Sequence, residues 1–119
     1  MARQLTDVIA ERTLELKKPG SNAVTEVRVR IGRPIQDPEP DNDWICPVQI
    51  VGLGDEQIAD VYGIDGVQAL LLGLQKVGID LAAAARAGME LRWLGGPDLG
   101  FPVTNPGGPW PHLPPEMMT

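Results

Sequence analysis

The stretch YGIDGVQALLLGLQKV at residues 62–77 carries the strongest helix signal in this sequence. Its apolar residues recur at helical spacing, and they are Val67, Leu70, Leu71, Leu74 and Val77. Asp65 can cap the first turn, and Gly78 can adopt the left-handed conformation that ends a helix. We therefore expect a helix of about 13 residues, or about 20 Å. Its apolar stripe has to lie on another element, for which a sheet is the candidate.

Two alternating segments precede this helix and predict an antiparallel hairpin. Residues 11–17 place Leu14 and Leu16 on one face, and residues 26–31 alternate in the same way around the turn residues 18–23. Charge and apolarity favour one register. In it the facing pairs are Lys17–Glu26, Glu15–Arg28 and Thr13–Arg30 on the wet face, with Leu16–Val27 and Leu14–Val29 on the dry face.

A third strand is expected over residues 43–53, with Trp44, Cys46, Val48 and Ile50 facing the core. Pro47 cannot donate to a ladder, so it places this strand at an edge or marks a bulge. Asp80 can cap a second short helix over residues 82–85 that ends at Gly88, and residues 89–93 alternate as a fourth strand. The predicted fold is α+β, a two-layer β-β-β-α-β arrangement with a four-stranded, mainly antiparallel sheet and one principal helix.

The chain is predicted to hold one domain, residues 1–102, and a tail, residues 103–119. Seven of the 12 prolines lie from Gly95 onward, a density that favours an extended, Pro/Gly-rich tail. A hydrophobic content of 43% is typical of globular proteins, and residues 1–7 lack the apolar core of a secretory signal. With no apolar run of membrane-spanning length, we expect a cytoplasmic protein without membrane contact.

The net charge of −6 is concentrated in one block. Residues 34–66 hold eight acidic residues and no lysine or arginine. An acidic chain binds phosphate backbones poorly, which makes nucleic acid an unfavourable partner. A protein with a basic surface fits the acidic block better.

Residues that could perform chemistry are few. Cys46 is the single cysteine and is interpreted as a core residue, and His112 is the single histidine and is interpreted as an exposed tail residue. Residues 52–57 depart from a dinucleotide fingerprint, and residues 37–48 depart from a calcium loop at its sixth and twelfth positions. No catalytic, cofactor or metal residue is assigned. The candidate partner-binding residues are Asp98, Phe101, Trp110, Asp37, Glu39, Asp41 and Asp43.

Three ordered motifs carry a resemblance to a known family. They are W-x-x-P-x-x-I-x-G-L from Trp44, Y-G-x-D-x-x-Q-A-L from Tyr62, and W-L-G-G-x-D-L-G-F-P from Trp93. Over residues 12–102 the chain resembles a family of small, uncharacterised bacterial proteins. The resemblance implies a single-domain bacterial protein and brings no activity, cofactor or catalytic residue with it.

Three hypotheses about function follow. The first is a protein-binding accessory or inhibitor-like protein of the immunity or antitoxin type, without catalytic activity. The alternative is a small-molecule-binding domain with its pocket between helix and sheet. The third is an enzyme that uses Asp98 or nearby carboxylates. A homo-oligomer formed through an edge strand or the tail is compatible with each of them.

Overall fold

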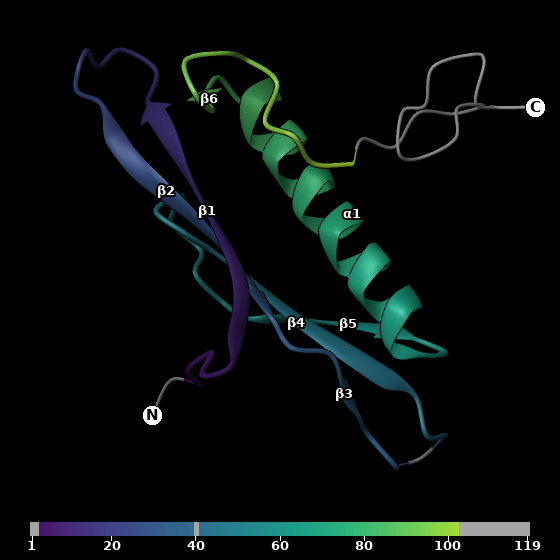
Figure 1. The fold of residues 1–119 in the computed structure, drawn as a ribbon. Helices are drawn as coiled ribbons and strands as arrows, with labels where there is room; N and C mark the ends of the chain where they lie inside the picture. Colours follow the sequence, from purple (N-terminus) through teal and green to yellow (C-terminus); the bar gives the residue numbers. More distant parts are fainter. Residues whose placement is uncertain (1–2, 40, 103–119) are drawn as a thin grey trace, which may run out of the picture.

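One long helix lies across one face of an antiparallel sheet (Figure 1). The computed structural model describes residues 3–39 and 41–102. The helix is α1 (Gly66–Arg86), and the strands are β1 (Val8–Lys17), β2 (Thr25–Gly32), β3 (Ile35–Gln36), β4 (Trp44–Val51), β5 (Ala59–Gly63) and β6 (Glu90–Arg92). The α+β class with one principal helix is confirmed.

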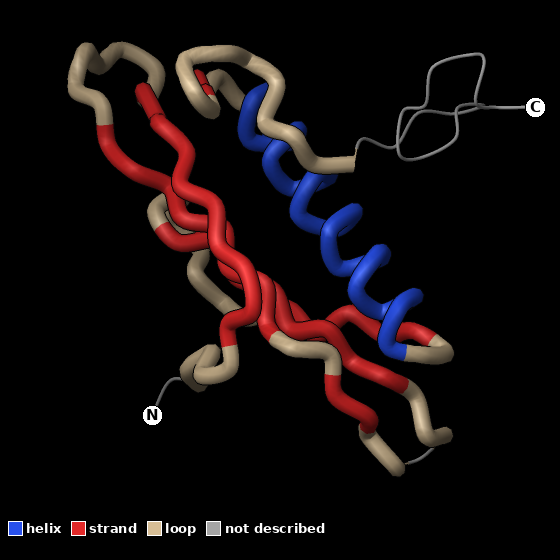
Figure 2. Tube along the Cα trace, viewed as in Figure 1, coloured by secondary structure: helices blue, strands red, loops and turns tan. Residues whose placement is uncertain are grey.

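The sheet has six strands, so the expectation of four was wrong. The strand order is β3-β4-β2-β1-β6, and β5 also pairs with β4 (Figure 2). The sequence reasoning missed β3 because it is two residues long within a Pro-rich loop. It missed β5 because Tyr62 and Gly63 were assigned to the approach to the helix, which left too short a pattern to recognise.

β4 lies inside the sheet, which corrects the expectation that Pro47 marks an edge strand. Its residue Val48 pairs with β2 on one side and with β5 on the other. Pairing on the β2 side stops at Val48 and resumes with β3 at Ile45. Pro47 falls in this interruption, where a missing backbone N–H leaves no ladder partner unsatisfied. On the β5 side the pairing runs without interruption through Pro47, which lies opposite Asp60.

The β1–β2 hairpin pairs in a register two residues away from the expected one. Thr13 faces Arg28, Leu14 faces Val27, and Glu15 faces Glu26. Because the shift is even, every side chain keeps the face that was predicted for it. In this register Lys17 lies opposite Glu90 of β6, with which it forms an ion pair of 4.0 Å, so the expected Lys17–Glu26 pair does not form.

α1 runs past both of its expected boundaries. Asp65 is the N-cap as predicted, and its Oδ1 accepts a hydrogen bond from Gln68 N at 2.8 Å. Gly78 does not end the helix, since it is buried within it, and the separate helix over residues 82–85 is the last part of α1. The helix ends before Gly88, which has a φ of 101°.

The buried face of α1 is rotated from the predicted stripe. Its buried residues are Ala69, Gly73, Val77, Gly78 and Leu81, whereas Val67 is 67% exposed. Small residues occupy this face because the helix lies close to β4: a Cβ on Gly73 would stand 3.0 Å from Cys46 Sγ.

By length and composition alone, α1 also qualifies as a membrane span, with a mean hydropathy of 1.3 over an 18-residue window.

The core lies between α1 and the sheet. The side chains of Leu14, Leu16, Val27 and Val29 are fully excluded from solvent, and Cys46 lies in the same cluster. At a typical 1.5–3 kcal/mol for each fully buried aliphatic side chain, this cluster is a main source of stability. At the β1 end of the sheet it is completed by residues 93–102, which we call the strap.

Candidate functional site

The strap begins with a tight turn and ends on the helix. Trp93 and Gly96 exchange two backbone hydrogen bonds of 2.9 and 3.0 Å across Leu94 and Gly95, whose φ angles of 53° and 80° are those of a type I′ turn. At its other end, Pro102 lies against Gly78 so closely that a Cβ there would stand 1.9 Å from the Pro102 carbonyl oxygen. The glycine in α1 thus makes room for the strap.

Arg12 on β1 holds the middle of the strap. Its guanidinium lies over the ring of Trp93, 3.7 Å from the centroid, and 4.9 Å from that of Phe101. Nη1 donates to the carbonyl oxygens of Leu99 and Gly100 at 3.0 and 3.2 Å. Sequence analysis missed this residue, although an arginine in phase with Leu14 and Leu16 was a usable signal.

Two candidate binding residues lie in the strap and take part in its structure. Asp98 Oδ1 accepts a hydrogen bond from Gly100 N at 2.9 Å, which is an Asx turn. Phe101 packs against the core and the Arg12 guanidinium. Trp110 and His112 lie outside the described residues.

The residues of the other two motifs also have structural positions. A Cβ on Gly63 would lie 2.4 Å from Ala69 N, so the Y-G and Q-A positions set the approach of β5 to α1. Gln68 Oε1 accepts from Ile64 N at 2.7 Å, next to the Asp65 cap. The ring of Trp44 would lie 3.3 Å from a Cβ on Gly66. The motifs therefore specify packing of the fold.

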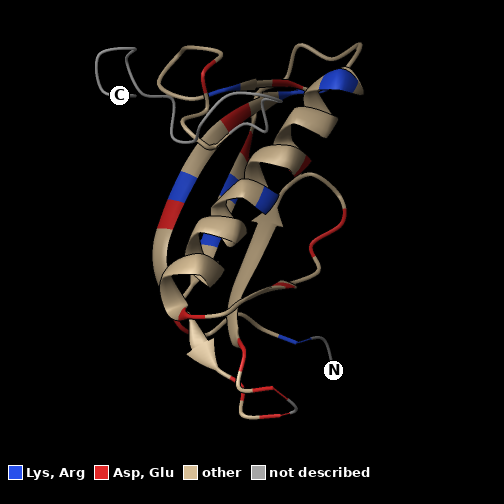
Figure 3. Ribbon diagram, turned by 90° about the vertical axis from the view of Figure 1, so that its right-hand side faces the viewer, with Lys and Arg blue, Asp and Glu red and all other residues tan. Residues whose placement is uncertain are grey.

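The four acidic candidates lie on the loop between β3 and β4 (Figure 3). Asp37 N donates to Asp43 O at 2.8 Å, and Glu39 N donates to Asp37 Oδ1 at 3.1 Å, so Asp37 ties both ends of the loop together. Within residues 3–39 and 41–102, no lysine or arginine forms an ion pair with Asp37, Glu39, Asp41 or Asp43. Their negative field is therefore uncompensated locally.

An apolar row lies beside this loop on the sheet face opposite α1. Ile45 pairs with Ile35 of β3 on one side and with Tyr62 of β5 on the other, so the three side chains line up across three strands. Ile35 is 45% exposed and Tyr62 is 55% exposed. We call this row, together with the acidic loop of residues 37–43, the acidic end.

A groove opens between α1 and β4, and we call it the α1–β4 groove. Its volume is about 490 Å³, within the range of small-molecule sites. Val48, Ile50 and Val77 contribute apolar lining. Asp55 and an ion pair of 2.9 Å between Lys76 Nζ and Asp80 Oδ2 provide its charged groups.

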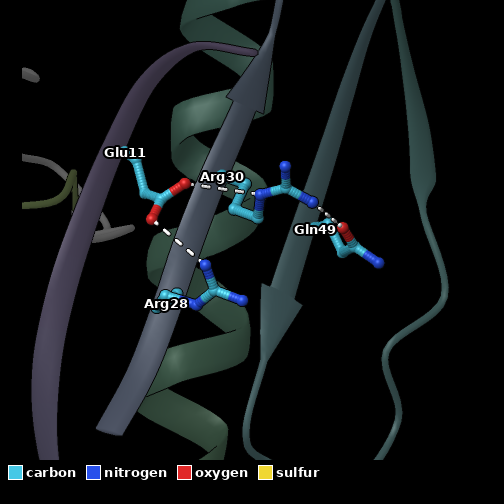
Figure 4. Close-up of polar contacts among 4 residues, drawn as sticks. All are labelled: Glu11, Arg28, Arg30 and Gln49. Carbon is cyan, nitrogen blue, oxygen red and sulfur yellow. Dashed lines mark hydrogen bonds and ion pairs between the residues drawn. The ribbon is translucent and has the colours of Figure 1, made fainter. Parts of the chain in front are cut away.

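The arginines of β2 are held by acidic and amide groups. Arg28 and Arg30 both pair with Glu11, at 3.6 and 3.4 Å, and Arg30 Nη1 also donates to Gln49 Oε1 at 3.1 Å (Figure 4). These contacts run across three strands on the sheet face opposite α1. They form a surface on which the arginines are paired with acidic and amide groups, which differs from the continuous positive patch that phosphate backbones require.

Reactive chemistry is limited in the part of the chain that the structure describes. Cys46 is buried, and its burial raises the pKa of the thiol to about 11, so the nucleophilic thiolate is scarce at neutral pH. The hydrogen bond with Asp60 raises the pKa of Arg3, as expected for a guanidinium in a surface ion pair. Among the described residues, no group of three His, Cys, Asp or Glu side chains is placed to hold a metal ion.

The geometry thus consists of a packed framework that carries the acidic end and the α1–β4 groove. The chain belongs to the family described as Domain of unknown function (DUF6968), whose model matches residues 10–103. The match takes in all three motifs and ends one residue after the strap. Comparison with curated proteins and with solved structures finds no match.

Proposed function

We propose that this chain is a small bacterial and cytoplasmic protein-binding accessory protein, inhibitor-like and non-catalytic, which recognises a partner through the acidic end. One observation carries the proposal: two exposed apolar side chains, Ile35 and Tyr62, flank the buried Ile45 beside four acidic side chains that have no described cationic partner. An apolar centre with a charged rim is the usual composition of a protein interface. The complementary surface is an apolar patch rimmed by lysine or arginine.

The test is a crosslinked pull-down from the native cells, quantified by mass spectrometry. Two variants alter the acidic end: Ile35→Ser/Tyr62→Ser shortens the apolar row, and Asp37→Lys/Asp43→Lys reverses two charges. We expect a stoichiometric partner of wild type to be lost with both. Because rim charges act mainly on the association rate, capture of the partner should also weaken with added salt.

Matched controls make the same kinds of substitution away from the acidic end. Val24→Ser changes an apolar residue that is 57% exposed in the β1–β2 loop, and Glu15→Lys/Glu26→Lys reverses two charges on the hairpin. Both controls should retain the partner. A partner that binds all the variants equally, or the absence of any stoichiometric partner, would contradict the proposal.

The α1–β4 groove supports a second candidate function, the binding of a small molecule. Two carboxylates and one ammonium group line it beside apolar side chains, a set that suits a ligand with an apolar body and a cationic group. Hexylamine is the probe, with hexanoate as its charge-reversed control. Hexylamine should shift the NMR signals of Val48, Ile50 and Val77, and Asp55→Asn/Asp80→Asn should abolish these shifts. Equal shifts with hexanoate would count against this function.

A further inference from the structure

The solvent side of α1 carries an unusual sequence for a surface helix. Only three of its 21 residues are charged, namely Lys76, Asp80 and Arg86, and Lys76 is paired with Asp80. Leu71, Leu72 and Ile79 are 40%, 37% and 45% exposed. A surface helix of a monomeric protein normally presents charged residues on this side. The side opposite the sheet therefore exposes apolar side chains among few charged ones, and it has no described partner.

The outward residues follow the spacing of a coiled-coil seam. Gln68, Leu72, Gln75, Ile79, Ala82 and Arg86 are separated by alternating steps of four and three residues. This spacing keeps one stripe of a helix facing a second helix. The stripe, which we call the α1 seam, is bordered by Gly78 with its Pro102 contact on one side and by Lys76 with Asp80 on the other.

We infer that the occupant of the α1 seam is the α1 seam of a second copy of this chain, packed antiparallel around a two-fold axis. Antiparallel pairing of the seam places Leu72 opposite Ala82 of the second copy, and Gln75 opposite Ile79. Each large side chain then meets a smaller or flexible one. The same alignment brings Gln68 opposite Arg86 of the second copy, which joins an amide oxygen to a guanidinium that has no described ion-pair partner.

Charge favours a second copy over a membrane surface as the occupant of the α1 seam. A helix that lies on a bilayer presents lysine and arginine toward anionic headgroups. The chain carries a net charge of −6, and the ammonium group of Lys76 on α1 is already held by Asp80. A seam whose one charged residue is Arg86 suits a copy of itself, since the two-fold pairing places Arg86 opposite the amide of Gln68.

The size of the seam sets the strength of the dimer. From Gln68 to Arg86 it is about 27 Å long, and a helix about 10 Å wide gives about 270 Å² in projection. Stable dimers bury about 800 Å² on each partner. We therefore expect dissociation in the micromolar range or weaker, with a monomer–dimer equilibrium that responds to concentration.

Sedimentation equilibrium of the full chain at increasing concentration tests this inference. The average mass should rise from 12.8 kDa toward twice that value. Leu72→Glu/Ile79→Glu should weaken self-association by about tenfold or more, because it buries carboxylates in the seam. Val24→Glu, an exposed apolar position away from the seam, should associate as wild type does. A monomer at every concentration, or a dimer unaffected by Leu72→Glu/Ile79→Glu, would overturn the inference.

Disulfide trapping tests the direction of packing with a separate readout. Chains with Gln68→Cys are mixed with chains with Arg86→Cys under mild oxidation, and the antiparallel arrangement predicts crosslinked heterodimers. Dominant Gln68→Cys homodimers would indicate parallel packing and contradict the proposed geometry. The native Cys46 is buried with a raised pKa, so it should not compete in the exchange.

Discussion

Arg12 joins the first long strand to the last segment of the described fold through a single side chain. Its two hydrogen bonds go to backbone carbonyls of the strap, and its planar group stacks on Trp93. A guanidinium can do both at once because its donors lie in the plane of the group and its faces remain free to stack. A lysine at this position could supply the charge, but it lacks the planar group with in-plane donors.

Replacing Arg12 by methionine should lower the free energy of unfolding by about 2–4 kcal/mol. This range combines lost charge-assisted hydrogen bonds with a lost cation–π contact, while the apolar stem is retained. Arg12→Lys should recover only part of the loss. The free energy of unfolding of each variant is measured by urea denaturation, with tryptophan fluorescence as the signal. Arg28→Met removes an exposed ion pair and should cost less than about 1 kcal/mol; equal losses at the two positions would refute the role of Arg12.

The thiol of Cys46 makes stability fall at high pH. Burial raises its pKa from 9.0 in the unfolded chain to about 11 in the folded one. Below pH 9 both states keep the proton, so this group adds no pH dependence. Between pH 9 and 11 only the unfolded state loses it, and the folded state should lose up to about 3 kcal/mol relative to the unfolded one.

Alkylation kinetics measure the same shift directly. Iodoacetamide at pH 9 should react with Cys46 slowly in the native protein and rapidly in urea. The comparison uses one thiol in one chain, so no second cysteine complicates it. Native and unfolded rates that agree at pH 9 would show that the thiol is neither buried nor shifted.

At the scale of elements, the β1–β2 register places two like charges face to face. Glu15 lies directly opposite Glu26. Glu26→Lys should therefore stabilise the protein by about 0.2–1 kcal/mol, since facing opposite charges are favourable. In the register expected from sequence, the same substitution would oppose Lys17 and destabilise the hairpin. Thermal unfolding at low salt distinguishes the two registers, and Glu39→Lys in the acidic loop is the control for net charge.

The helix and the strap meet at Gly78, where the expected effect of alanine is opposite to its helix propensity. Alanine favours a helix over glycine by about 1 kcal/mol. At Gly78 its Cβ would meet the backbone of Pro102, whereas at Gly73 it would meet the side chain of Cys46 at 3.0 Å. We expect Gly78→Ala to lower the free energy of unfolding by about 1–3 kcal/mol through overpacking, and more than Gly73→Ala does. Urea titration of both variants checks the order.

Local chemistry made some of these elements predictable. The Asp65 cap and the faces of the hairpin follow from a side-chain oxygen and from period-two alternation, and both were identified correctly. The extension of α1 through Gly78 could not be predicted, because the strap that occupies the space of its side chain lies 24 positions later in the chain. The predicted buried face of the helix was wrong for a related reason: Val67 and Leu71 belong to the helix but face away from the sheet.

At the scale of the molecule, the two ends of the sheet differ in construction. One end is the acidic end, and the other is closed by β6 and the strap around Arg12. The acidic residues themselves were visible in the sequence. Their apolar neighbours Ile35 and Tyr62 were not, because two strands that sequence reasoning missed bring them together across Ile45.

Closure by the strap predicts that the fold depends on residues 89–102. A chain that ends at Gly88 lacks β6 and leaves Leu14 and Leu16 uncovered at the β1 edge, so it should lose cooperative unfolding. Far-ultraviolet circular dichroism in a urea titration measures this loss. A chain that ends at Val103, where the family match ends, is the control and should unfold cooperatively.

The pairing of β1 with β6 also sets the order of events during protein synthesis. Leu16 lies beside Leu91 in the sheet, so 74 residues must be translated between the two partners. At about 5–20 residues per second, a ribosome leaves the apolar face of the hairpin uncovered for several seconds before its last partners emerge. During that interval the nascent chain exposes Leu14 and Leu16 to solvent, and we expect holdase chaperones to bind it until the strap leaves the exit tunnel.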